Sequence, residues 1–224
     1  MKLNTSEKFL ILALHPDKPR FLITQPALNA GFIGSILMDL SIDQMVEIKN
    51  SYIIHADKKS SGKEADRLIL DKIMAASKPR KVKRWIANLS QRARKYRQLV
   101  LKDLEKNGFV KIESARFLFF KYKRIRLINK PFRTQLAMEL RNAILHGKSV
   151  DHERAAILGM VQACKMHKML STDKSDLAII RKKLKVLITK DSITQGVGQV
   201  ISEMQAAIVG AVIASTVATS AGAH

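Results

Sequence analysis

Two arginines, Arg94 and Arg97, have the clearest capacity for chemistry in this sequence. Residues 91–107 around them have apolar side chains at helical spacing, which predicts one buried stripe: Ala93, Tyr96, Val100 and Leu104. At about 100° per residue the two arginines lie together just beside that stripe, where they would be partly desolvated. A phosphate group would offset this desolvation and their mutual repulsion through charge-assisted, bidentate contacts. The alternative interpretation is a solvated basic face whose long stems cover the core.

Residues 109–122 hold the second candidate, a β-hairpin with strands at 109–112 and 116–122 and a turn at 113–115. Bulky aromatic residues stand beside cations there, and the residues of interest are Phe117, Phe119, Phe120, Lys121, Lys123 and Arg124. A peripheral membrane contact needs this mixture, because cations attract anionic headgroups and aromatic side chains insert. The alternative is a core strand with basic outward side chains. Both interpretations can hold, since alternate residues of a strand point to opposite faces.

The nucleophilic and metal-binding residue types do not assemble a site. Cys164 and His167 lie one helical turn apart, but zinc needs two further ligands and the nearby histidine in sequence is His152. We therefore expect a buried thiol beside a surface histidine, with no metal and no cofactor. A single cysteine also excludes an internal disulfide and suits a reducing cytosol.

Glycine pairs and neighbouring aspartates do not form an active site either. The segments 31–34 and 196–198 each hold two glycines but lack the rest of any phosphate-loop motif. We expect them to allow close helix approach or to begin a helix. Asp39 and Asp43 are interpreted as caps and surface groups rather than an acid–base pair. Because no nucleophile, base and orienting group come together, the sequence does not predict an enzyme.

The elements that must position these residues are mostly helices. The chain has 224 residues and is 46% hydrophobic, which is enough for a substantial core. We expect one domain over 1–224 with a mainly α fold: a helical bundle with a buried C-terminal helix, surrounded by amphipathic helices, with one or two short β-hairpins. The expected helices lie near 6–14, 26–40, 65–76, 82–89, 91–107, 131–146, 151–170 and 176–188, with a first hairpin over 45–54.

The segment 204–224 contains no charged residue and is rich in small side chains. Its length would allow a membrane span, but few Leu or Phe residues drive insertion. Small residues recur every four positions and predict a smooth ridge for close helix packing: Ala206, Gly210, Ala214 and Ala218. We therefore favour a central helix buried in protein over a membrane anchor.

The charge distribution identifies the kind of partner. The chain carries 40 Lys and Arg against 19 Asp and Glu, a net charge of +21. Residues 78–133 hold 19 basic and 3 acidic side chains, so this quarter of the chain has a net charge of +16. Such a concentrated field predicts an anionic partner for the middle of the chain. Residues 1–6 do not resemble a secretory signal, and we expect a cytoplasmic protein.

Several ordered motifs resemble the Golgi phosphoprotein three family, from about residue 3 to residue 213. They are the stretch Glu7–Leu14, the segments Gly31–Leu40 and Val82–Ile86 with Leu89-Ser90, then Arg94–Arg97, Leu104–Gly108, Phe117–Phe120 and the helix that begins at Pro131. The resemblance implies an all-helical core ringed by amphipathic helices, with a projecting hairpin over Val110–Tyr122 that serves membrane contact and oligomerisation. Eukaryotic members bind phosphatidylinositol 4-phosphate on Golgi membranes and act as adaptors that retain glycosyltransferases.

The resemblance places two arginines of the family's headgroup site on Arg94 and Arg97. A tryptophan and a third arginine of that site fall at Thr24 and Ile33, so half of the constellation is absent. The disordered N-terminal arm of eukaryotic adaptors is also missing. We therefore expect a shorter relative of bacterial type, with a less specific grip on anionic lipid.

Two main functions compete at this point. The first is a peripheral membrane-binding module at the cytosolic membrane face, with anionic phospholipids, a membrane-protein client and further copies of the chain as candidate partners. The second is nucleic-acid binding, because a basic helix followed by a glycine and a basic hairpin resembles a winged helix. Against it, residues 91–107 keep a wide apolar stripe and offer few Asn or Gln to read bases. A scaffold that oligomerises through its hairpin, without lipid, is the third interpretation.

Overall fold

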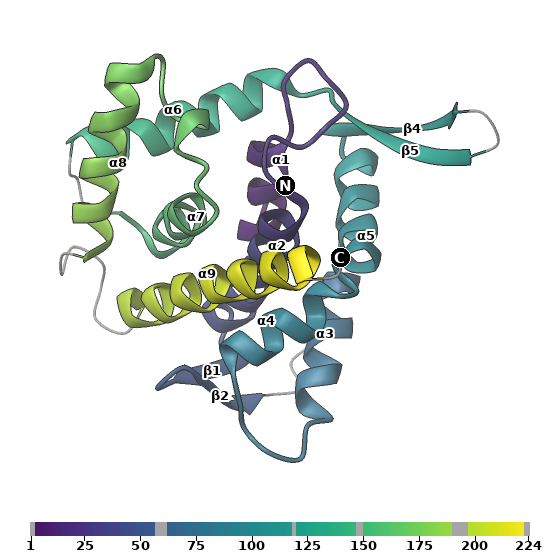
Figure 1. Ribbon diagram of the computed structural model, residues 1–224, viewed down its shortest axis with the longest axis vertical. Coiled ribbons are helices and arrows are strands. Elements are labelled where there is room, and N and C mark those ends of the chain that lie inside the picture. Colours follow the sequence, from purple (N-terminus) through teal and green to yellow (C-terminus); the bar gives the residue numbers. More distant parts are fainter. Residues whose placement is uncertain (1–2, 57–61, 118–119, 147–149, 190–196, 222–224) are drawn as a thin grey trace.

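The computed structural model describes residues 3–56, 62–117, 120–146, 150–189 and 197–221, and helices take up most of this length (Figure 1). The helices are α1 (Thr5–Ala13), α2 (Gln25–Ile42), α3 (Glu64–Met74), α4 (Val82–Ser90), α5 (Ala93–Lys106), α6 (Lys130–His146), α7 (His152–Ala163), α8 (Lys174–Thr189) and α9 (Val197–Ala221), with a 3₁₀ turn, η1 (His167–Met169). The strands are β1 (Val46–Lys49), β2 (Tyr52–Ala56), β3 (Arg80–Lys81), β4 (Val110–Phe117) and β5 (Phe120–Leu127). The expected mainly α fold with short hairpins is confirmed.

Helix α2 lies at the centre of the core. Its residues from Ala27 to Leu40 are buried apart from Asn29, which is typical of a helix that is apolar on nearly all sides. It packs against α1, α4, α5, α7 and α9. Pro26 stands in its first turn, where the missing N–H has no intrahelical partner to lose.

Two glycines of α2 permit these close contacts. A Cβ atom on Gly31 would lie 2.4 Å from Cys164 Sγ and 2.6 Å from Phe9 Cζ. A Cβ atom on Gly34 would lie 2.6 Å from Ile208 Cδ1 of α9. The expectation that residues 31–34 allow close helix approach is therefore confirmed.

Helix α9 crosses the middle of the molecule and packs against α2, α4 and α7 (Figure 1). Its buried side consists of Ile201, Met204, Ala207, Ile208 and Ala211. The predicted packing ridge is wrong for Ala206 and Ala214, which are exposed, because the larger aliphatic side chains fill the space between the neighbouring helices instead. The side chain of Ala218 lies outside the described residues. Among the described segments, no helix combines the length and the apolar character needed to cross a membrane.

Two further details differ from the sequence-based expectation. The first hairpin, β1–β2, gains a third strand, because β3 pairs with β2 at Tyr52↔Lys81 and Ile53↔Arg80. The helix expected over 151–170 ends at Ala163, since Lys165 adopts a left-handed conformation with φ of 54° and turns the chain into η1.

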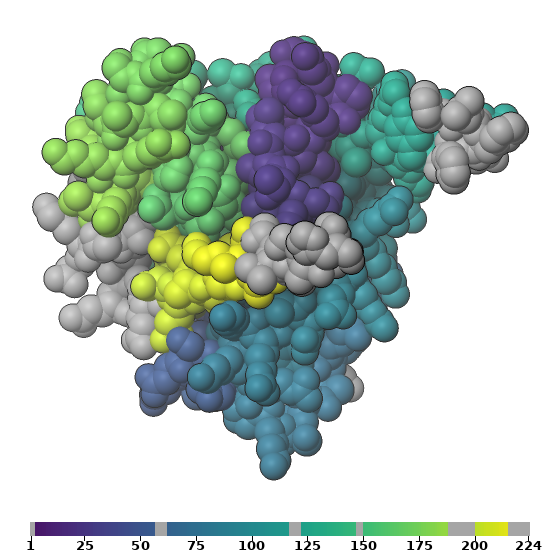
Figure 2. Space-filling model, in the orientation of Figure 1, coloured from purple at the N-terminus to yellow at the C-terminus, as the bar shows by residue number. Residues whose placement is uncertain are grey.

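The remaining helices lie on two sides of α9, and the second hairpin projects from the body (Figures 1 and 2). Helices α6, α7 and α8 form one side, whereas α3, α4 and α5 form the other. The hairpin β4–β5 extends beyond the end of α5, and Gly108, with φ of 76°, follows the C-cap of that helix. That glycine is the helix terminator expected from the sequence.

Candidate functional site

Helix α5 positions both candidate arginines. Its buried stripe contains Ala93, Tyr96, Val100 and Leu104, as expected, and Leu101 joins them. This stripe packs toward α2 and α3 and fixes the rotation of the helix about its axis. The flank that carries Arg97 is thereby brought against the first turns of α2.

Arg97 lies inside the protein rather than at the edge of the stripe. Only 7% of its surface is exposed. Its Nη1 donates a hydrogen bond to Asn29 Oδ1 on α2 at 2.9 Å, and its guanidinium carbon lies 5.6 Å from the centre of the Phe21 ring. Asn29 Oδ1 also accepts a hydrogen bond from Gln25 Nε2 at 2.6 Å. Among the described residues, no carboxylate forms an ion pair with this guanidinium.

The electrostatics of Arg97 follow from these neighbours. Burial, together with the positive charge of Arg94, lowers the pKa of Arg97 from 12.5 to about 10. The side chain therefore stays charged at neutral pH while its partners are an amide and an aromatic ring. A buried cation with neutral partners is the arrangement in which an incoming anion gains most.

Arg94 is exposed one helical turn before Arg97. The structure thus brings the predicted pair together, as the effect of Arg94 on the pKa of Arg97 shows. The expectation that both are partly desolvated is wrong for Arg94, because it lies further from the buried stripe. Together the two side chains place one buried and one solvated cation beside each other, which suits a group with several anionic oxygens.

Thr24 and Ile33, which replace the tryptophan and the third arginine of the family site, lie at the N-cap of α2 and within α2, and they do not complete the site. Thr24 is exposed at the N-cap of α2, and its side chain makes no capping hydrogen bond. Ile33 is fully buried in the core and does not reach the surface beside Arg97. Sequence reasoning missed Asn29 and Phe21, although Asn29 is conspicuous as a polar residue among the apolar residues of α2.

The second hairpin forms as expected but its turn lies elsewhere. Strands β4 and β5 pair from Val110↔Leu127 to Phe117↔Phe120, so the turn predicted at 113–115 is wrong. Residues 113–115 belong to β4, where Glu113 lies opposite Arg124 and forms a diagonal ion pair with Arg126, at 3.6 Å between Arg126 Nη2 and Glu113 Oε2. Residues 118 and 119, which follow the last pair of the ladder, are not described, so the structure does not place Phe119.

The cationic residues of the hairpin face solvent where the structure describes them. Lys123 and Arg124 are exposed, and the Arg124 guanidinium donates hydrogen bonds to Tyr122 Oη at 3.1 Å and 2.5 Å. The backbone of Phe117, Phe120 and Lys121 belongs to the ladder, whereas their side chains lie outside the description. Exposed Lys111 and Arg116 add to the positive charge of the opposite strand.

Cys164 and His167 do not form a site. Cys164 Sγ is buried 3.5 Å from the carbonyl oxygen of Ala27, and burial raises the pKa of this thiol to about 12. His167 is buried too, contrary to the expected surface position, with Nε2 2.8 Å from Gln162 Oε1. The part of the chain that the structure describes holds no group of three His, Cys, Asp or Glu side chains able to bind a metal ion.

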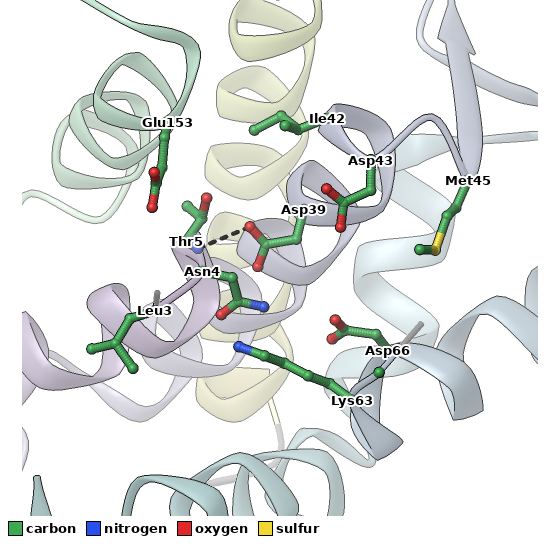
Figure 3. A pocket seen from close by; sticks show the side chains of 11 residues that line it. Leu3, Asn4, Thr5, Asp39, Ile42, Asp43, Met45, Lys63, Asp66 and Glu153 are labelled. Carbon is green, nitrogen blue, oxygen red and sulfur yellow. Dashed lines mark hydrogen bonds between the residues drawn. The ribbon is translucent and has the colours of Figure 1, made fainter. Parts of the chain in front are cut away.

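Figure 3 shows a hollow of about 290 Å³ between the first turn of α1, the end of α2 and the start of α3. The two carboxylate oxygens of Asp39 accept hydrogen bonds from the backbone N–H groups of Thr5 and Ser6, each at 2.9 Å. Lys63, which also lines the hollow, forms an ion pair with the buried Glu7. Because these polar groups hold α1, α2 and α3 together, we assign them a structural role, which agrees with the interpretation of Asp39 as a cap.

Comparison with known proteins places the chain in a family. The model of the family described as Golgi phosphoprotein 3 (GPP34) matches residues 6–204. A comparison with curated proteins finds no match. The family match spans most of the chain, from α1 into the first third of α9, and includes Arg94, Arg97 and the projecting hairpin. The chain therefore belongs to the Golgi phosphoprotein 3 (GPP34) family.

Proposed function

We propose that this protein docks on a membrane surface by binding anionic phospholipid headgroups, of the phosphatidylinositol 4-phosphate type, at Arg94 and Arg97. The observation that carries the proposal is the buried guanidinium of Arg97, whose partners are Asn29 and Phe21. A buried charge without a counter-charge destabilises the folded protein, because the charge has lost its hydration and nothing replaces it. Removal of one partner from a buried ion pair destabilises a protein for the same reason. A headgroup phosphate would supply the missing negative charge and bind the exposed Arg94 at the same time.

The projecting hairpin supports docking on a membrane. It carries exposed cations on both strands, and it extends away from the body of the protein (Figure 1). Each cation near an anionic leaflet contributes roughly 1 kcal/mol of binding free energy. The hairpin would therefore strengthen the attachment without specificity for one headgroup, and the protein would act as a peripheral protein of the cytosolic membrane face.

Half of the residues of the family's headgroup site are absent here, which limits the specificity for one lipid headgroup. With Thr24 and Ile33 in place of the tryptophan and arginine, two basic side chains remain to bind the headgroup. We therefore expect binding to anionic lipids in general, with a weak preference for phosphatidylinositol 4-phosphate. An adaptor role with a membrane-protein client, and oligomerisation through the hairpin, are extensions of the same proposal.

Liposome co-sedimentation tests the proposal. Vesicles would be neutral, generically anionic, or doped with phosphatidylinositol 4-phosphate, each at low and moderate salt. The double variant Arg94→Ala/Arg97→Ala should lose most of the binding to anionic vesicles. The matched control, Lys102→Ala/Lys106→Ala, removes the same charge from exposed positions of the same helix. Equal losses in both variants would mean that net charge alone attracts the protein and that there is no headgroup site.

Nucleic-acid binding is the second candidate, because Gly108 joins α5 directly to the basic hairpin in the manner of a winged helix. The apolar stripe of α5 disfavours it, because Tyr96, Val100 and Leu104 are buried against the core and cannot face a groove of DNA. A duplex DNA competitor in the same assay separates the two functions. If DNA displaces the protein from vesicles and binding declines steeply with salt, the basic surface belongs to nucleic acid.

A further inference from the structure

Helix α8 carries a second cluster of positive charge, far from α5 and the hairpin in the sequence. Its basic residues are Lys174, Arg181, Lys182, Lys183 and Lys185. Asp176 is its one acidic residue, and this side chain is buried, with Oδ1 3.0 Å from Arg141 Nη2 of α6. The outer surface of α8 therefore carries basic side chains and no acidic one.

The same surface exposes two large aliphatic side chains. Ile179 is 48% exposed and Val186 is 44% exposed. They lie seven residues apart, on the same side of the helix, and Lys182 and Lys183 lie between them on either flank. These aliphatic residues are not part of the core-facing side of α8, because Ile180, Leu184 and Leu187 already form that side.

A helix that lies in the interface of a bilayer has this composition on its outer surface. Aliphatic side chains enter the boundary between headgroups and acyl chains, and lysines beside them extend their ammonium groups to the phosphates. A nucleic acid would neutralise the lysines but would leave Ile179 and Val186 in water. A second copy of this chain, which carries a net charge of +21, would bring two cationic surfaces together.

We propose that the outer surface of α8 is a second contact with the anionic bilayer, in addition to the headgroup site and hairpin. This inference rests on the proposed function, because it assumes that the protein meets a membrane. Figures 1 and 2 show α8 at the outer edge of the molecule, at the end opposite the hairpin. Two separated attachments increase the residence time of the protein on the membrane, since release of one leaves the other bound.

Site-specific labelling tests the inference. Ile179→Cys would be labelled with an environment-sensitive fluorophore, while buried Cys164 stays unlabelled in the folded protein. The emission should shift to the blue and rise several-fold with vesicles that contain phosphatidylserine, and should not change with neutral phosphatidylcholine vesicles. Nitroxide-labelled lipids should quench it. Tyr122→Cys reports on the hairpin, and exposed Met74→Cys on α3 serves as the control position.

A binding measurement complements the fluorescence. Lys182→Gln should weaken binding to the anionic vesicles about 5-fold, and Lys182→Gln/Val186→Ser should weaken it by a further factor of about 3 to 10. Both substitutions are on the surface, and an unchanged circular dichroism spectrum would show that the helix is intact.

The outcomes distinguish this inference from the proposed function. A response at both Ile179→Cys and Tyr122→Cys supports both. A response at Tyr122→Cys alone, with wild-type binding by the Lys182→Gln/Val186→Ser variant, would overturn the α8 contact and leave the proposed function standing. A response at Ile179→Cys alone would support α8 and refute insertion of the hairpin. If DNA removes the protein from vesicles and neither label responds, the α8 inference is refuted.

Discussion

Replacement of Arg97 by methionine should make the free protein more stable while it weakens membrane binding. Burial and the charge of Arg94 lower the pKa of Arg97 from 12.5 to about 10, a difference that corresponds to roughly 3 kcal/mol against the charged form in the folded chain. Since the folded-state pKa is depressed, this cost is present at every pH below about 10 and declines only as the pH rises through that value.

Favourable contacts of Arg97 offset part of this cost. Its hydrogen bond to Asn29 contributes roughly 1.5 kcal/mol and its contact with the Phe21 ring roughly 0.5 kcal/mol. Methionine retains the unbranched apolar stem, and Asn29 Oδ1 still accepts the hydrogen bond from Gln25. The free energy of unfolding of Arg97→Met should therefore rise by about 1 kcal/mol.

Urea unfolding, followed by the fluorescence of Trp85, measures this change. Lys102→Met is the matched control, because it removes the same charge from an exposed position about 140° around α5 from Arg97. Its stability should stay within about 0.5 kcal/mol of the wild type. Inorganic phosphate should stabilise the wild type and the control, and should have little effect on Arg97→Met.

A loss of stability in Arg97→Met would refute this account. If unfolding becomes easier by more than about 1 kcal/mol, Arg97 is satisfied inside the protein and its burial needs no external anion. Unchanged binding of the variant to anionic vesicles would lead to the same conclusion.

Three further predictions concern the core. Burial raises the pKa of Asp39 from 3.8 to about 6, although the hydrogen bonds from Thr5 and Ser6 oppose this shift. The free energy of unfolding should therefore decline by about 3 kcal/mol as the pH rises from 3.8 to about 6. In urea unfolding, Asp39→Asn should remove this pH dependence. Cys164, whose thiol pKa burial raises to about 12, should react with a thiol reagent only at the rate of unfolding. Gly31→Ala should cost about 1–3 kcal/mol, whereas Gly62→Ala, with open space around it, should be nearly neutral in thermal melts.

Each of these predictions has a contradicting result. If the urea midpoint of the wild type does not change between pH 3.8 and about 6, Asp39 keeps its ordinary pKa. Rapid labelling of Cys164 in native buffer would show that the region between α2 and α7 opens easily. Equal melting temperatures for Gly31→Ala and Gly62→Ala would show that α2 can move away from Phe9 at little cost.

Local patterns in the sequence predicted most of the elements. The mainly apolar character of α2, the apolar stripe of α5 and the glycine after α5 can all be recognised from residues close together in the sequence, and the structure has each of them. The turn of the second hairpin was placed wrongly because charged residues on both strands obscured the alternation. The ion pair between Glu113 and Arg126 crosses the ladder and depends on a register that spacing alone does not reveal.

The environment of the candidate site depended on distant residues. Spacing brought Arg94 and Arg97 together, but the burial of Arg97 comes from Asn29, 68 positions earlier, and from the loop that holds Phe21. The cationic surface of α8 was also missed, because the larger excess of positive charge over residues 78–133 dominates the charge distribution of the sequence. A helix-by-helix count would have found it.

The position of α9 in the chain affects how the protein can fold during synthesis. Its buried residues close the core against α2, α4 and α7, and all three precede it in the sequence. The ribosome therefore releases most of the helices before the segment that completes their packing has been made. Until then the part of α2 that packs against α9 stays uncovered, so we expect the nascent chain to need protection by chaperones and to become compact only after α9 emerges.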